Sequence, residues 1–68
     1  MDVHEALWGL YRAASKRTYA DSPEQYKFWS KYVAYNKTMA IQAGATEEEI
    51  ALALDGDGFR LQARLENR

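Results

Sequence analysis

Hydrophobic positions recur every three or four residues through most of this chain, a spacing that is typical of α-helices. In the first stretch they fall on one helical face at Val3, Leu7, Leu10, Tyr11, Ala14 and Thr18. A second stripe beside it runs through His4, Trp8, Tyr11, Ser15 and Tyr19. Asp2 can cap the start of this helix, and Glu5 completes a capping-box pattern. We therefore predict a first helix with a broad apolar side.

A second, longer helix is predicted from Ser22 to about Ala43. Ser22 suits the N-cap position, and Pro23 suits the first helical position. Gln25, three residues after Ser22, can complete a capping box. Gly44 can take the left-handed conformation that ends a helix. Two apolar stripes follow this helix, one through Tyr26, Trp29, Val33 and Ala40, the other through Phe28, Tyr32, Tyr35 and Met39. Two stripes indicate contacts on two sides, and we place Trp29 at the centre of the core between the long helices.

The last third of the chain predicts two short helices. Thr46 and Glu49 form a third capping box, which opens a helix over residues 47–54. The segment Asp55-Gly56-Asp57-Gly58 is a turn by composition. Residues 59–68 then read as a last helix, whose core candidates are Phe59, Leu61 and Leu65. We predict an all-α fold, a long helical hairpin followed by a short two-helix, helix-turn-helix-like unit, in a single domain spanning residues 1–68.

Composition limits the kinds of site that the chain can carry. A chain of 68 residues buries only a small core, and its 13% aromatic content supplies much of the contact area. No cysteine is present, which excludes disulfides and thiolate metal sites. No apolar run approaches the ~20 residues of a membrane span. The N-terminus has no basic stretch before an apolar run, as a secretory signal would, so we expect a cytoplasmic protein with no membrane association.

Recognisable catalytic patterns are missing from the sequence. His4 is the one histidine, and no cysteine accompanies it in a transition-metal set. Three serines, Ser15, Ser22 and Ser30, have no base in a known motif. No glycine-rich loop cradles a phosphate, and a chain this short forms a cleft with difficulty. We therefore expect no enzyme activity, no metal, no cofactor and no small-molecule substrate.

Charge is strongly segregated along the chain, although the net charge is only −1. Residues 11–42 carry an excess of basic side chains over acidic ones. Residues 43–58 carry acids alone, at Glu47, Glu48, Glu49, Asp55 and Asp57. Such separation can steer a charged partner even when the sum is close to zero.

Residues 43–65 resemble the helix-turn-helix segment of small bacterial and phage regulators. The resemblance rests on Ala43-Gly44-Ala45-Thr46, Glu49-Ile50-Ala51, Ala53-Leu54 and Arg64-Leu65. In such a unit Ala51 would allow the two short helices to approach, and Leu54 and Leu61 would fill their shared core. Because the second helix of these regulators lies in the major groove, the resemblance implies contacts to DNA from Arg60, Gln62 and Arg64. A DNA-binding regulator of phage or bacterial type is the function that it favours.

The charge balance favours a different reading, a protein-binding module or inhibitor that binds no DNA. Aromatic and basic residues alternate on the second helix, and the candidate partner-binding residues there are Tyr26, Phe28, Lys31, Tyr32 and Tyr35. A third hypothesis is a structural subunit of a helical homo-oligomer. Across the three hypotheses the expected partner is DNA, a protein target or a second copy of the chain. A basic patch joining Arg60 and Arg64 to the lysines of the second helix would favour DNA. An exposed aromatic patch would favour a protein partner.

Overall fold

The computed structural model describes all 68 residues and contains four helices and no strand. The helices are α1 (Val3–Thr18), α2 (Pro23–Gln42), α3 (Glu47–Leu54) and α4 (Gly58–Glu66). The predicted all-α architecture, a long helical hairpin followed by two short helices, is confirmed. Gly44, with φ of 96°, follows the end of α2, and Gly56, with φ of 73°, lies between α3 and α4. Both glycines take a backbone conformation that other residues rarely adopt.

Each helix begins at a side chain that satisfies one of its free amide groups. The N-cap oxygens of Asp2, Ser22, Thr46 and Asp57 accept hydrogen bonds from the amides of Glu5, Gln25, Glu49 and Arg60. Only α3 has a complete capping box, in which the Thr46 amide also donates to Glu49 Oε1 at 2.8 Å. The reciprocal bonds that the sequence predicted for the first two helices do not form, so that part of the prediction is wrong. One bond to the N-cap is sufficient to start each helix.

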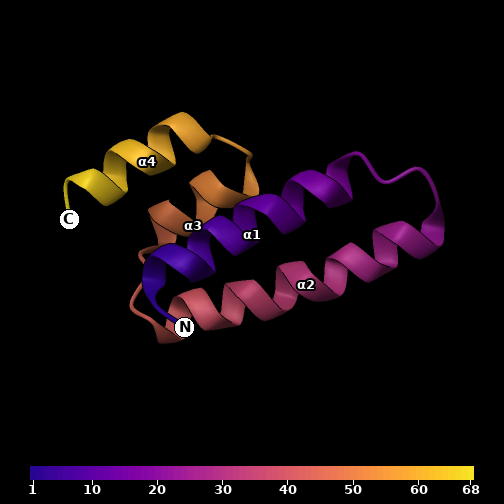
Figure 1. Cartoon of the computed structure of the whole chain (residues 1–68), viewed down its shortest axis with the longest axis horizontal. Helices are drawn as coiled ribbons and strands as arrows, with labels where there is room; N and C mark the ends of the chain where they lie inside the picture. The colour runs from indigo at the N-terminus through magenta and orange to yellow at the C-terminus, as the bar shows by residue number, and fades with distance from the viewer.

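The two long helices run antiparallel, and α3 lies beside α1, close enough to α2 for Ile41 of α2 and Ile50 of α3 to line one hollow (Figure 1). In this arrangement α3 packs against α1, and α4 packs against α3. Helices α2 and α4 lie on opposite sides of the molecule, with α1 and α3 between them (Figure 1). The lysines of α2 and the arginines of α4 are therefore separated by the body of the protein.

The core is small and consists mainly of alanine and leucine. Its buried residues are Ala6, Leu7, Leu10, Ala13, Ala14, Val33, Ala40, Ile50, Ala53, Leu61 and Leu65. Helix α1 contributes the most, because it is the central helix and packs against both α2 and α3. Helix α2 contributes only Val33 and Ala40, although it is the longest helix. Much of the apolar surface of α2 is therefore not used by the core.

Trp29 is not at the centre of the core, which corrects the prediction from its stripe. It is partly buried and packs against the edge of the core. Where α1 meets α2, Gly9 lies against the Asn36 side chain, and the buried side chains of α2 are the small Val33 and Ala40. The covered side of α2 is therefore filled by small side chains, and the Trp29 indole lies at the edge of the core.

Two further residues lie on the opposite side of their helices from the one expected. Phe59 is 88% exposed, because Leu61 and Leu65 face the core and a helix turns by about 200° over two residues. Ala51 is exposed for the same reason, and Ala53 is the small residue that is fully buried on α3. The short unit is thus packed through Ala53 and Leu61, and the predicted roles of Ala51 and Phe59 are wrong.

Candidate functional site

Four aromatic side chains on α2 form an exposed surface, which we call the aromatic face: Phe28, Trp29, Tyr32 and Tyr35. The ring centroids of Phe28 and Trp29 are 5.1 Å apart, edge to face, and those of Phe28 and Tyr32 are also 5.1 Å apart. Trp29 and Tyr32 complete the cluster at 5.8 Å. Phe28, Tyr32 and Tyr35 are 51%, 46% and 54% exposed. Contacts between the rings order this surface before any partner arrives.

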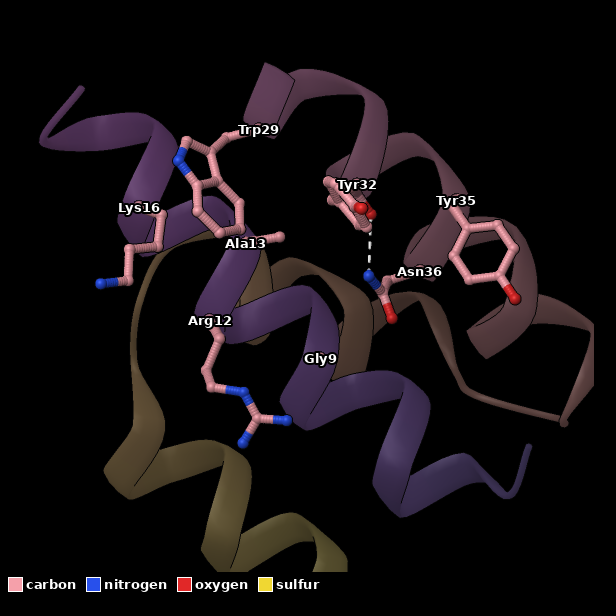
Figure 2. A pocket seen from close by; sticks show the side chains of 8 residues that line it. All are labelled: Gly9, Arg12, Ala13, Lys16, Trp29, Tyr32, Tyr35 and Asn36. Carbon is pink, nitrogen blue, oxygen red and sulfur yellow. Dashed lines mark hydrogen bonds between the residues drawn. The ribbon is translucent and has the colours of Figure 1, made fainter. Parts of the chain in front are cut away.

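A shallow groove of about 360 Å³ runs between α1 and the aromatic face. Its α2 wall is formed by Trp29, Tyr32, Tyr35 and Asn36, and its α1 wall by Gly9, Arg12, Ala13 and Lys16. Figure 2 shows the side chains of these two helices on either side of the groove, with the charged ends of Arg12 and Lys16 extending from α1. The side-chain amide of Asn36 donates a hydrogen bond from Nδ2 to the Tyr32 carbonyl oxygen, with 2.9 Å between the two atoms.

A second hollow of about 390 Å³ adjoins the groove on the outer side of α2. It is lined by Phe28, Lys31, Tyr32 and Tyr35. Because Tyr32 and Tyr35 line both hollows, the two form one continuous surface. The aromatic face is thus bordered by Arg12 and Lys16 on one side and by Lys31 on the other.

The basic residues at this surface are not engaged by the protein itself. The three ion pairs of the structure join Arg60 to Asp57, Arg64 to Glu48 and Arg68 to Glu49. All of them lie within the acidic C-terminal half, so none involves Arg12, Lys16 or Lys31. The acids of the chain therefore neutralise the arginines around α4, and the cations beside the aromatic face are left without an acidic partner.

The structure brings together four of the five predicted partner-binding residues, namely Phe28, Lys31, Tyr32 and Tyr35. Tyr26, the fifth, lies apart from them, with the Arg17 guanidinium 5.7 Å from its ring centroid. The sequence analysis missed the α1 side of the groove, including Arg12 and Lys16, and assigned Trp29 to the core. The spacing of Arg12 and Lys16 by four residues was the available signal, since it places both on one face of α1.

The predicted DNA-contacting residues lie on α4, far from this surface. Gln62 is exposed, and the Arg60 side chain is 76% exposed with its Nε atom 3.6 Å from Asp57 Oδ2. Arg64 forms an ion pair with Glu48 of α3. The structure does not join these arginines to the lysines of α2, because α1 and α3 lie between the two helices (Figure 1). The basic patch that would favour DNA is therefore not formed.

A buried acidic residue near α4 has a structural role. Glu49 is only 3% exposed, and Arg68 donates to both of its oxygens, from Nε at 2.7 Å and from Nη2 at 2.6 Å. These bonds, together with that from the Thr46 amide, lower the pKa of Glu49 to about 2. Arg68 also donates to the Gly44 carbonyl oxygen at 2.9 Å. The pair thus ties the end of α4 to the start of α3.

Two other kinds of site are not found in the structure. No three His, Asp or Glu side chains gather closely enough to hold a metal ion. None of the four helices combines the length and the apolar character needed to cross a membrane.

Comparison with known proteins gives no relative from which a function can be transferred. No family model, no curated protein and no solved structure matches this chain. The functional argument therefore rests on the residues of the chain and their arrangement.

Proposed function

We propose that this chain is a small non-enzymatic regulatory protein that acts by binding a protein target through the aromatic face. The observation that carries the proposal is the exposure of Phe28, Tyr32 and Tyr35 on the longest helix, next to a partly exposed Trp29. A contiguous apolar patch on a small domain is typical of an interaction surface. Aromatic rings in particular dominate the binding energy of protein interfaces.

The distribution of burial supports the same proposal. A domain of 68 residues has little apolar surface to spare, because it buries a smaller share of its surface than a large one. Even so, the core consists mostly of alanines and leucines, and the phenylalanine and the three tyrosines of α2 remain exposed. Tyr and Trp combine an apolar body with a polar tip, which suits a surface that is wet when free and buried when bound.

Selection from a random library of peptides of about 16 residues, displayed against the immobilised protein, tests this proposal. We expect the enriched peptides to lose about ten-fold or more in affinity for the double variant Phe28→Ala/Tyr32→Ala. The control is Phe59→Ala/Arg60→Ala, a double variant that removes the exposed ring of Phe59 on α4, away from the aromatic face. Peptides that are equally weakened by the control, or the absence of any enriched peptide, would contradict the proposal.

DNA binding through α4 is the second candidate. It is supported by the outward position of Arg60, Gln62 and Arg64 on a short helix that follows α3 after a tight turn. The pairing of Arg60 and Arg64 with carboxylates weighs against it, since phosphates would compete with Asp57 and Glu48. Titration with a mixed-sequence duplex at low salt is the corresponding test, because electrostatic attraction is then least screened.

A further inference from the structure

We propose that the groove between α1 and α2 receives an amphipathic helix of a partner protein, and that this helix carries carboxylates one turn apart along one edge. This inference rests on the proposed function and specifies the chemistry of the target. It follows from the direction of the groove, from the spacing of its cations and from the pairing of the chain's own acids.

The groove follows the axes of two antiparallel helices. On α1 its residues run from Gly9 through Arg12 to Lys16, and on α2 they run from Trp29 to Asn36. Seven residues of helix extend over about 10 Å, or two turns. An occupant that lies along this direction as a helix would present residues at i, i+3, i+4 and i+7 to the aromatic rings, as in other helix-in-groove complexes.

The cations at the edge of the groove have the periodicity of a helix. Arg12 and Lys16 are four residues apart on α1, which corresponds to about 6 Å along the axis. Acidic side chains at positions i and i+4 of a partner helix have the same spacing. Arg12 and Lys16 are in none of the protein's ion pairs, so both are free to donate hydrogen bonds to such carboxylates. Lys31 provides a positive charge on the opposite side of the aromatic face, next to Tyr32 and Tyr35.

A second copy of this chain is a poor source of those carboxylates. Its acidic helix is α3, but Glu48 is paired with Arg64 and Glu49 is buried against Arg68. Asp57 is likewise engaged by Arg60. The groove of one copy would therefore find Glu47 alone on the first turn of α3 of another. The remaining helical carboxylates, Glu5, Glu24 and Glu66, are on three different helices, so no two of them are one turn apart. The acidic helix is expected to come from a different protein.

Two fluorescent peptides of about 18 residues, long enough to form a helix, test the inference by anisotropy. Both carry leucines at i, i+3, i+4 and i+7. One has glutamates at two flanking positions a turn apart, and the other has glutamines there. We expect the glutamate peptide to bind about five-fold more tightly at low salt, and the preference to fall as the salt concentration rises.

The double variant Arg12→Gln/Lys16→Gln should bind the two peptides equally. The control Lys27→Gln/Lys37→Gln removes the same charge from exposed positions of α2 that do not line the groove, and it should retain the preference. Circular dichroism of both variants checks that they remain folded.

The outcomes separate the inference from the function on which it rests. Equal binding of both peptides to the unmodified protein, lost in Phe28→Ala/Tyr32→Ala, overturns the acidic helix and leaves the protein-binding function in place. Failure of both peptides also overturns the inference, and the proposed function falls with it only if the library selection yields no peptide that depends on the aromatic face. Tighter binding of an oligothymidine of about 20 nucleotides, dependent on Arg12 and Lys16, overturns the inference in favour of single-stranded nucleic acid.

Discussion

Gly9 of α1 lies directly against Asn36 of α2. A β-carbon built at Gly9 would stand 2.5 Å from Asn36 Oδ1 and 3.1 Å from Asn36 Cγ, both closer than non-bonded atoms normally come. The absence of a side chain at Gly9 therefore allows α1 and α2 to approach here with the Asn36 amide between them. Both residues line the groove, so this contact helps to define its shape.

The contact predicts that the effect of Gly9→Ala depends on residue 36. Alanine is favoured over glycine inside a helix by about 1 kcal/mol. In the unmodified protein the clash with Asn36 should cancel this gain, whereas in Asn36→Ala the gain should appear in full. Urea unfolding of the four proteins of the cycle measures the difference, and equal stabilisation in both backgrounds would contradict the contact.

The Glu49–Arg68 pair predicts a loss of stability in acid. Because the pKa of Glu49 is lowered from 4.5 to about 2, its contribution is complete above pH 4.5 and disappears as the pH falls toward 2. Replacing Glu49 with glutamine should cost about 2–3 kcal/mol at neutral pH, since Arg68 loses its charged partner and a buried group loses hydrogen bonds. Thermal unfolding across this pH range should then show a flatter profile for Glu49→Gln. If the melting temperatures of the unmodified protein and of Glu49→Gln fell equally with pH, the stabilising role of the Glu49–Arg68 ion pair would be contradicted.

The partial burial of Trp29 predicts a modest role in stability. We expect Trp29→Ala to cost about 1–2 kcal/mol, because only part of the ring is removed from water. Leu10→Ala should cost about 3 kcal/mol or more, since Leu10 is fully buried and its loss leaves a cavity. Chemical unfolding of the two variants gives the comparison. A larger loss of unfolding free energy for Trp29→Ala than for Leu10→Ala would contradict this placement and support Trp29 as a central core residue.

The local features of the fold were predictable from sequence, and the choice of the buried face was not. Caps such as Ser22 and Thr46 act within one turn, so their residues are sufficient to place the helix starts. The two apolar stripes of α2 look alike in sequence, and only the packing of α1 decides that Val33 and Ala40 are covered. The glycine at position 58, inside the first turn of α4, also depends on tertiary packing. A β-carbon there would lie 3.1–3.2 Å from the ring of Tyr11, a residue far away in the chain.

The same limit applies to the candidate site. The alternation of aromatic and basic residues on α2 indicated Phe28, Lys31, Tyr32 and Tyr35, which do lie together. The spacing of Arg12 and Lys16 places both on one face of α1, but only the pairing of α1 with α2 shows that this face forms a wall of the groove.

The pairing of the α4 arginines with Asp57 and Glu48 predicts that α4 adds no measurable affinity for DNA, so Arg64→Ala should bind a mixed-sequence duplex at low salt as the unmodified protein does. Fluorescence titration of the unmodified protein and of Arg64→Ala is the measurement. Each phosphate neutralised by the protein would add about −0.9 to the slope of log affinity against log salt. A steep slope, together with a loss of about 1–3 kcal/mol in Arg64→Ala, would instead support the helix-turn-helix reading.

The central claim, that the aromatic face binds a protein rather than supporting the fold, is tested most directly in Phe28→Ala/Tyr32→Ala. The affinity of this variant for a library-selected peptide is measured beside its melting temperature. Both rings are about half exposed, at 51% and 46%, so we expect unfolding free energy to fall by about 1–2 kcal/mol in total. Binding should weaken about ten-fold or more while the variant remains folded. Unchanged binding in a folded variant, or unfolding of the variant, would contradict the claim.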